Sequence, residues 1–373
     1  MGPPRHHPRI DLAERDFRLD QGRERLDLWL ASSRHLSSPF YQESQSIEHF
    51  TFNEREDYEK GFAKLYDQEI APYLRDKETH RQAAITRSKR WIALVLAITA
   101  FLALQAYKID PILPIFPTFF GLMGVLFLYL SRTGKVQKEI TQTLRPILCE
   151  FFPDTEYSDL APTTDFSADT LRGLNIIPTA DHSNFGPSIT GAWRDTPYLL
   201  TKASFYNERR DNDGDSKRER VFSGIILQID CVIDMPTIVF YPDFGKTMNK
   251  LYGWATRNKR PDHKLTLPDP EIEKVFEVYT DDLDEANARL SPDFGTKLLS
   301  FSRDYQKVKK HISAAFRGRK FYLAIDLPHD FMNFDVGNRP LSEANEAIHK
   351  ALSDIMIPCK IIDILLDPEP EIP

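Results

Sequence analysis

Acidic residues gather at two places where a metal ion or acid-base chemistry would need them. The first is the loop Arg209–Ser216, with the sequence Arg-Arg-Asp-Asn-Asp-Gly-Asp-Ser. An EF-hand loop needs a carboxylate at its first position, glycine at its sixth and a bidentate glutamate at its twelfth. Alignment on Gly214 puts Arg209 first and Arg220 twelfth, so both terminal ligands are missing. Asp213-Gly214 between two strand-like runs instead predicts a hairpin turn, with a weak metal site as the alternative.

The second acidic group directly follows Thr280 and consists of Asp281, Asp282, Asp284 and Glu285. Four carboxylates so close together could hold a metal or serve as acid and base. The same residues are typical of a helix start, because capping side chains and negative charges satisfy free N–H groups and the helix dipole. Ser291-Pro292-Asp293 predicts the start of the next helix in the same manner. We therefore interpret this group as structural.

Nucleophiles and histidines show no catalytic spacing. The histidines lack a ligand pattern such as His-x-x-x-His, no serine or cysteine lies in a nucleophile elbow, and no glycine-rich phosphate loop is present. Cys149, Cys231 and Cys359 are odd in number and far apart, which argues against a disulfide framework or a zinc site. The sequence thus predicts no catalytic, cofactor-binding or metal-binding residue and no cofactor. Free thiols fit a reducing compartment such as the cytosol.

Charge is distributed unevenly along the 373 residues, whose formal net charge is -7. From Phe151 onward acidic residues outnumber basic ones, whereas the first 150 residues are slightly basic. This balance argues against general nucleic-acid binding by the C-terminal part. Its basic residues could face an anionic membrane surface, at about 1 kcal/mol per charge, or could be scattered solvated charge. The main ones are Arg257, Lys259, Arg260, Lys264, Lys307, Lys309, Lys310, Arg317, Arg319 and Lys320.

Two apolar runs, Trp91–Tyr107 and Ile112–Leu130, organise the chain and are separated by four residues. As helices they would extend roughly 25 and 28 Å, against a hydrocarbon core of about 30 Å. Neither run contains a charge, and one at the centre would cost at least ~2.5 kcal/mol. The pattern predicts a transmembrane hairpin. A buried helical hairpin of a soluble protein is the alternative.

The flanks of the hairpin predict its orientation. Basic residues lie before the first run and after the second, whereas the turn offers only Lys108, so both ends are expected in the cytoplasm. Prolines at 111, 114 and 117 predict that the second ordered helix begins at Pro117. The hairpin would then be shallow, or Pro111–Phe116 would need cover from another subunit, because free backbone groups are costly in lipid. The flanking basic residues are Arg87, Lys89, Arg90, Arg132, Lys135 and Lys138.

Amphipathic patterns on both sides of the hairpin predict two stalk helices, in residues 45–90 and 131–158. Apolar residues recur at helical spacing, so the two helices could pair as an antiparallel stalk. Pro72 and Pro146 should kink or bend it. The stripes consist of Tyr58, Phe62, Leu65, Ile70 and Leu74 in the first helix, and of Val136, Ile140, Leu144, Ile147 and Phe151 in the second.

Residues 159–366 carry mostly strand patterns with helices grouped later, which predicts an α+β domain on a largely antiparallel sheet. The predicted strands are Ser188–Trp193, Tyr198–Tyr206, Val221–Ile233, Thr237–Tyr241, Val275–Tyr279, His311–Phe316, Lys320–Asp326 and Lys360–Leu366. The predicted helices are Phe244–Thr256, Asp281–Leu290, Asp293–Arg303 and Ser342–Met356.

The two ends of the chain are expected to lie outside this architecture. Residues 1–44 show no signal peptide and predict a poorly ordered start with a short helix in Asp11–Ser32, which could dock on a partner or lie on the protein's own surface. Residues 367–373 form a proline-rich tail. The expected division is therefore 1–44, stalk 45–90, hairpin 91–130, stalk 131–158, domain 159–366 and tail 367–373.

Several stretches together resemble the bacterial membrane proteins grouped as domain of unknown function 3137. They are the Phe62–Arg81 helix before two membrane runs, Arg220–Ile225, Val275–Pro292 and Phe321–Ile325, of which Val275–Pro292 is the most specific. The resemblance extends over roughly residues 50–366. It implies a bacterial inner-membrane protein with a cytosolic α+β domain, and it supplies no catalytic residues.

We expect a non-enzymatic, membrane-anchored cytosolic domain with a binding or scaffold role. Its expected partners are the lipid bilayer and either a protein or further copies of the chain, and not nucleic acid. One alternative is a membrane-bound enzyme whose site is assembled from scattered residues. Another is an oligomeric channel or transporter subunit, which two uncharged short helices favour less because they supply no polar path.

Overall fold

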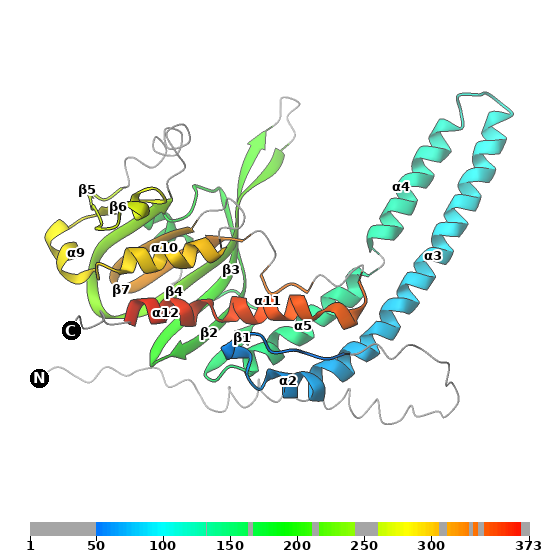
Figure 1. Cartoon of the computed structure of the whole chain (residues 1–373). Coiled ribbons are helices and arrows are strands. Elements are labelled where there is room, and N and C mark those ends of the chain that lie inside the picture. Colours follow the sequence, from blue (N-terminus) through cyan, green and yellow to red (C-terminus); the bar gives the residue numbers. More distant parts are fainter. Residues whose placement is uncertain are drawn as a thin grey trace, which may run out of the picture. The chain divides into compact units, whose positions relative to one another are not determined.

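A computed structural model describes residues 50–131, 133–162, 167–210, 216–242, 260–305, 312–327, 331–334 and 339–366. Within these ranges, long helices accompany one seven-stranded sheet whose strand pairs are all antiparallel. The chain therefore has the expected α+β fold (Figure 1). The predicted helices in Asp11–Ser32 and Phe244–Thr256, and the tail 367–373, lie outside the described residues.

The strands follow the order β1-β2-β3-β4-β6-β5 across the sheet, and β7 pairs with β4. β4 and β7 each join two predicted strands into one. Register shifts in β4 between Asp230 and Ile238 bend it, which explains why the sequence pattern is broken there. The strands are β1 (Thr155–Ser158), β2 (His182–Trp193), β3 (Thr196–Arg210), β4 (Ser216–Pro242), β5 (His263–Lys264), β6 (Phe276–Thr280) and β7 (Ile312–Asp326).

The structure has helices where Asp281–Leu290, Asp293–Arg303 and Ser342–Met356 were predicted. The predicted stalk helix 131–158 is wrong at its end, because the helix stops at Glu150 and Thr155–Ser158 form a strand, and two short helices at Ala168–Leu174 and Pro270–Glu273 were not predicted. The predicted strand Lys360–Leu366 is also wrong. These residues belong to α12, and a short apolar run fits a buried helix as well as a strand. The helices are the 3₁₀ helix η1 (Asp57–Glu59), α2 (Phe62–Leu65), the π-helical turn η2 (Tyr66–Ile70), α3 (Ala71–Tyr107), α4 (Ile115–Ser131), α5 (Gly134–Glu150), α6 (Ala168–Leu174), α8 (Pro270–Glu273), α9 (Leu283–Arg289), α10 (Phe294–Tyr305), the 3₁₀ helix η4 (Leu341–Glu343), α11 (Asn345–Ile355) and α12 (Ile357–Leu366).

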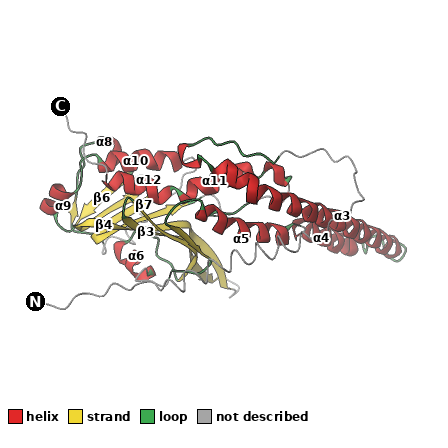
Figure 2. Ribbon diagram, turned by 90° about the horizontal axis from the view of Figure 1, so that it is seen from below, coloured by secondary structure: helices red, strands yellow, loops and turns green. Residues whose placement is uncertain are grey.

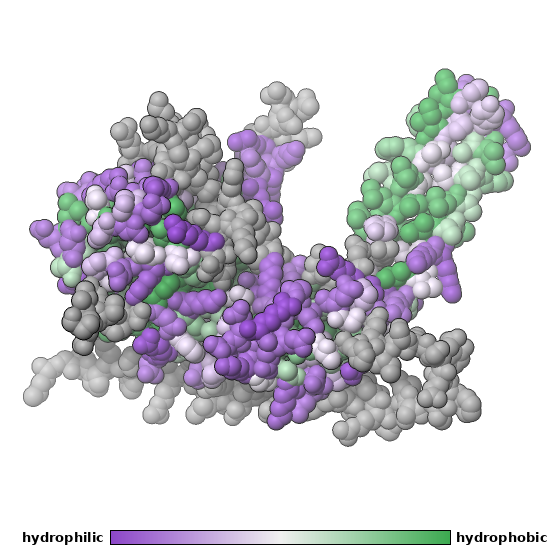
Figure 3. All heavy atoms as spheres, viewed as in Figure 1, coloured by the Kyte–Doolittle hydropathy of each residue, from purple (hydrophilic) through white to green (hydrophobic). Residues whose placement is uncertain are grey.

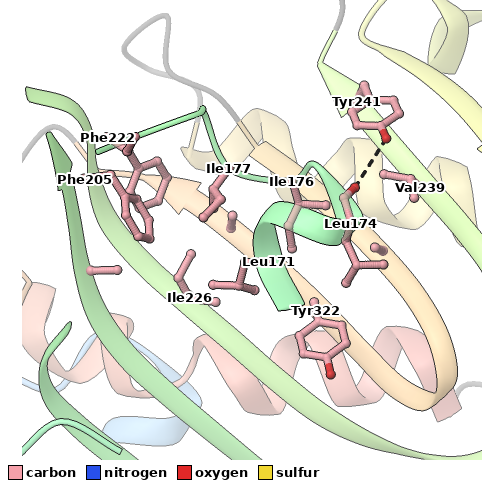
Figure 4. Close-up of a cluster of buried hydrophobic side chains, with 14 of the residues drawn as sticks. Leu171, Leu174, Ile176, Ile177, Phe205, Phe222, Ile226, Val239, Tyr241 and Tyr322 are labelled. Atoms are coloured by element: carbon pink, nitrogen blue, oxygen red, sulfur yellow. Dashed lines mark hydrogen bonds between the residues drawn. The ribbon is translucent and has the colours of Figure 1, made fainter. Parts of the chain in front are cut away.

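Helices cover both faces of the sheet. Figure 2 shows α10 and α12 on one face and the short α6 on the other. Beneath α10, the Phe294 ring lies 5.5 Å from that of Phe240 and 5.1 Å from that of Phe316. Beneath α6, Leu171 and Leu174 are buried in a separate cluster, drawn in Figure 4. The two clusters hold the sheet between the helical layers. Burial of each large apolar side chain stabilises the fold by about 1.5–3 kcal/mol.

The predicted stalk pairing is present. Tyr73 of α3 donates a hydrogen bond of 3.0 Å to Thr143 of α5, and Lys77 forms an ion pair of 2.9 Å with Glu139. Pro72 lies in the first turn of α3, directly after the π-helical turn, so the backbone changes helix type there without leaving the helical path. Pro146 lies within the continuous helix α5.

The stalk is also part of the domain's core. Glu78 of α3 accepts the backbone N–H of Leu341 at 3.0 Å, and Arg145 of α5 donates to the backbone carbonyl of Met332 at 3.0 Å. Both contacts join the stalk to residues that are nearly 200 or more positions away in sequence. Stalk and domain therefore share buried contacts, and we do not treat the stalk as a free linker.

Candidate functional site

The hairpin formed by α3 and α4 is held together by small residues. A Cβ atom at Gly121 would lie 2.1 Å from the hydroxyl oxygen of Thr99, so only glycine permits this approach of the two helices. Gly124 faces Val95 more loosely, at 3.7 Å from its nearest atom. Near the base, Ser88 donates a hydrogen bond of 3.1 Å to the carbonyl of Leu128. Close backbone approach through small residues is typical of helix pairs in membranes.

On the face that Figure 3 displays, apolar residues cover most of this hairpin, with hydrophilic residues toward its tip and its base. Of the large apolar side chains exposed in the described residues, all but four lie between Trp91 and Leu130. Phe127 is 71% exposed and Phe120 is 69% exposed. A contiguous apolar surface made of so many exposed side chains is unfavourable in water. The exceptions are Leu160, Val232, Ile233 and Leu283. The apolar surface is therefore concentrated on one structural element.

By length and composition, two helices of the described chain could cross a membrane, and their most apolar windows are 0% and 6% buried. This exposure contradicts the alternative of a buried core hairpin. The expected start of the second helix at Pro117 is wrong, because α4 begins at Ile115 and reaches roughly 25 Å. Pro117 still lies in the first turn, where the missing N–H costs no helical hydrogen bond.

Charged and aromatic residues mark the two ends of the hairpin. At its base, Arg87, Lys89 and Arg90 are exposed on α3, and Lys135 is exposed at the start of α5. Trp91 and Tyr129 are exposed near this basic end, whereas Tyr107 is exposed near the turn. Tryptophan and tyrosine prefer the two interfaces of a bilayer. The hairpin thus has the residue order of a membrane segment.

The acidic group after Thr280 caps a helix, as expected. Asp282 accepts the backbone N–H of Glu285 at 2.9 Å at the start of α9, and Asp281 accepts that of Thr237 at 2.9 Å. Across the described residues, no three histidine, cysteine, aspartate or glutamate side chains come together in a way that could hold a metal ion. In the loop at 209–216, β3 and β4 pair as far as Arg210 and Ser216, and residues 211–215 lie outside the described part of the chain.

One buried polar pair was not found from the sequence. His349 of α11 lies 2.6 Å from the carboxylate of Glu59, and its ring stacks on Phe52 at 4.3 Å. The two partners are 290 residues apart, so no local pattern connects them. The pair fastens the start of the stalk to α11, and we interpret it as structural because its carboxylate is 1% exposed.

The three cysteines are free thiols. Burial raises the pKa of Cys359 to about 12 and that of Cys231 to about 11, and it raises the pKa of Cys149 further. A thiol is nucleophilic as the thiolate, so none of them is activated at neutral pH.

The predicted basic residues divide among several environments. Lys320 pairs with Asp230, and Arg319 donates a hydrogen bond of 3.1 Å to the carbonyl of Val232. Lys264 is exposed on β5. Arg260 and Arg317, which are 57 positions apart in sequence, meet at one hollow. Outside the described residues lie Arg257, Lys259, Lys307, Lys309 and Lys310.

This arginine hollow has a volume of about 230 Å³ and lies beside the end of α6. Arg260 is clamped at its rim, with its guanidinium 5.2 Å from the ring centre of Tyr241 and 5.1 Å from that of Tyr279. Its Nη1 atom also donates to the Glu277 carboxylate at 3.1 Å. The lining residues are Gly173, Leu174, Thr237, Val239, Arg260, Pro261, Asp281 and Arg317.

Tyr241 connects the hollow to the core. Burial raises the pKa of Tyr241 to about 12 despite the nearby Arg260 guanidinium, so the phenol keeps its proton at neutral pH. It donates that proton to the carbonyl of Leu174 at 3.3 Å, the contact dashed in Figure 4. The last turn of α6 is thereby fixed against β4.

The comparison with protein families bears on the C-terminal part of the chain. Residues 220–366 match the family described as "Protein of unknown function (DUF3137)", which confirms the resemblance for this part of the chain, while Phe62–Arg81 lies outside the match. The matched segment runs from β4 to α12 and contains Arg220–Ile225, Val275–Pro292 and Phe321–Ile325. No curated protein and no solved structure matches the chain.

Proposed function

We propose that this protein of the DUF3137 family is a membrane-anchored binding or scaffold protein whose α3–α4 hairpin spans a bilayer. The observation that carries the proposal is the concentration of exposed apolar side chains on the hairpin, next to an exposed basic base. Exposed to water, this surface would drive aggregation, whereas its contact with lipid tails is favourable.

Backbone satisfaction supports insertion. In lipid every polar backbone group needs an internal partner, and continuous helices provide it. The hydroxyl groups of the hairpin also bond within it: Thr118 donates to the carbonyl of Pro114 at 2.8 Å and Ser131 to that of Phe127 at 2.8 Å. Hydroxyls satisfied in this way lower the cost of entering lipid.

Basic residues at the base favour an orientation with the domain in the cytoplasm. Arg87, Lys89 and Arg90 on one helix and Lys135 and Lys138 after the other lie on the same side, while the turn carries Lys108 with Asp110. The positive-inside rule then keeps both ends of the hairpin on the cytoplasmic side. A bacterial inner membrane is the location that this orientation and the family resemblance favour.

The shared core of stalk and domain favours a scaffold role over a loose tether. Because α3 runs from the buried Glu78 into the hairpin as one helix, the domain is held at a fixed distance from the membrane surface. Such an arrangement suits presentation of a surface to a protein partner or to further copies of the chain. Channel function is less supported, since the hydroxyls of Ser88, Thr118 and Ser131 bond to backbone carbonyls of α4 or of the turn before it and so offer no polar path.

Alkaline carbonate extraction followed by cysteine labelling tests the proposal. The chain is expected to stay in the pellet, because only an integrated hairpin resists extraction. In intact spheroplasts, Asp110→Cys in the turn should react with a membrane-impermeant maleimide, and the matched variant Gln82→Cys on the exposed stalk should react only after permeabilisation. Release by carbonate would overturn membrane integration. Protection of both cysteines in intact spheroplasts would overturn the full span and favour a shallow hairpin.

A further inference from the structure

The lining of the arginine hollow contains a buried hydrogen-bond donor without a partner, Nε of Arg260. In the described residues, five buried side-chain polar atoms lack a hydrogen-bond partner. One of these is Nε of Arg260, which lines the hollow, and another is Nε of Arg172, which precedes the lining residue Gly173 in sequence. Unsatisfied buried donors are rare in folded proteins and often indicate an ion or water that completes the site. An unpartnered buried donor is complementary to an acceptor ligand.

The charged groups at the hollow also bear on which ligand it could bind. Glu277 and the Tyr279 hydroxyl both accept from Nη1 of Arg260, at 3.1 and 3.2 Å, which leaves Nε and Nη2 of that guanidinium for a ligand. Arg317 is exposed on β7 and forms no ion pair within the described residues, although Asp281 lines the same hollow. The lining residues thus include two guanidinium groups and one carboxylate, and Glu277, outside the lining, pairs with Arg260.

We propose that the arginine hollow binds an anionic oxygen ligand, a phosphate or carboxylate group, between Arg260 and Arg317. The planar guanidinium fork matches both groups in two-point hydrogen bonds. Arg260 is already held by two tyrosine rings and a carboxylate, so little side-chain freedom is lost on binding. A volume of about 230 Å³ accommodates such a group with its nearest substituent. This site lies outside the hairpin and does not depend on the membrane proposal.

Isothermal titration of the full-length protein in detergent, at constant ionic strength, tests the site. Inorganic phosphate and citrate serve as probes, the first for phosphate and the second for carboxylate recognition. Arg317→Gln should weaken binding of the preferred anion by roughly ten- to hundredfold, because a hydrogen bond between charged groups is worth about 1.5–3 kcal/mol. The matched control is Arg218→Gln, which removes the same charge from an exposed position of β4 and should leave binding unchanged.

A second variant moves affinity in the opposite direction. Asp281→Asn keeps an acceptor for the Thr237 N–H but removes the like charge, so anion binding should tighten by roughly three- to tenfold. Soluble dihexanoyl phosphatidic acid and glycerol 3-phosphate form two further arms, and tighter binding of the first would assign the phosphate to a lipid headgroup. Absence of binding of both inorganic phosphate and citrate at millimolar concentration, or equal losses in Arg317→Gln and Arg218→Gln, would overturn the proposal.

Discussion

Replacement of Glu78 by alanine is expected to loosen the junction between stalk and domain. The Glu78 carboxylate is 5% exposed and accepts four hydrogen bonds: from Arg81 Nε at 2.8 Å, Arg81 Nη2 at 2.7 Å, Gln82 at 2.9 Å and the Leu341 N–H at 3.0 Å. Its removal leaves the guanidinium of Arg81, which is 6% exposed, without its counter-charge.

The expected loss in the free energy of unfolding is about 3–5 kcal/mol, the usual cost of breaking one side of a buried ion pair. The matched control is Glu139→Ala, whose carboxylate pairs with Lys77 but is 57% exposed, and it should cost less than about 1 kcal/mol. The double replacement Glu78→Leu with Arg81→Met should recover much of the loss, because an apolar pair of similar volume carries no stranded charge.

Urea denaturation of the detergent-solubilised protein, followed by far-UV circular dichroism, measures these differences. Burial raises the pKa of Glu78, but the hydrogen bonds from Arg81, Leu341 and Gln82 outweigh it and the net pKa is lowered. A lowered pKa contributes stability that is present above the unfolded value of about 4.3 and is lost as pH falls through the folded value. The gap between wild type and Glu78→Ala should therefore narrow in acid. If Glu78→Ala cost no more than Glu139→Ala, the reasoning would be refuted.

Three further predictions concern the hairpin, the sheet and the thiols. Leu96→Arg places a charge on an exposed position in the apolar run of α3 and should lower the membrane-bound fraction, since the charge costs at least ~2.5 kcal/mol in lipid. Leu160→Arg, at a still more exposed leucine outside the hairpin, should leave that fraction unchanged, and fractionation with immunoblotting compares the two variants. Gly224→Ala should destabilise the β4–β7 pairing by about 1–3 kcal/mol in the same urea assay, because its Cβ would lie 1.9 Å from the carbonyl oxygen of Ile325. Gly134→Ala, with open space at the same atom, serves as its control and a similar loss there would contradict the steric argument. Cys149 and Cys359 should resist iodoacetamide at pH 7.5 until the chain is unfolded, and because burial raises their pKa values the thiols contribute stability that is lost only as pH rises above about 8.5; mass spectrometry of rapid labelling in the native state would expose an error.

The stalk and hairpin were the most predictable parts of the chain. Their apolar stripes have helical spacing, and the residues Phe62, Ile70, Leu74, Ile140 and Leu144 are indeed buried. The prediction treated the stripes as facing only each other, since a stripe indicates burial without naming what covers it. In the folded chain the same helices also contact the segment around Leu341 and Met332.

Short apolar segments were harder to assign. Ile357–Leu366 contains four isoleucines, which favour a strand by composition, yet it forms α12 with Lys360 exposed between buried neighbours. Asp363 in its last turns accepts the indole N–H of Trp193 at 2.9 Å. That contact comes from β2, 170 residues earlier, and tertiary packing of this kind overrides local propensity.

The arginine hollow was only half visible in the sequence. Arg260 and Arg317 were noted among the basic residues, but their meeting depends on how β4 places β6 and β7 at its two edges. The helix α6, which closes one side of the hollow, was missed because seven residues with two buried leucines give a weak periodic signal. Sites assembled from four separate elements leave no local spacing to detect.

The distance along the chain between Glu78 and Leu341 also sets an order of events during synthesis. Leu341 follows Glu78 by 263 residues, so at a translation rate of about 5–20 residues per second it emerges roughly 13–50 s later. Throughout this interval α3 exists without the partner that will bury its acidic and basic side chains. A purely apolar contact face would be prone to aggregate on the ribosome, whereas Glu78 and Arg81 remain well hydrated while they wait. The stalk therefore meets Leu341 late in synthesis, through a pair whose charges are favourable in water until then.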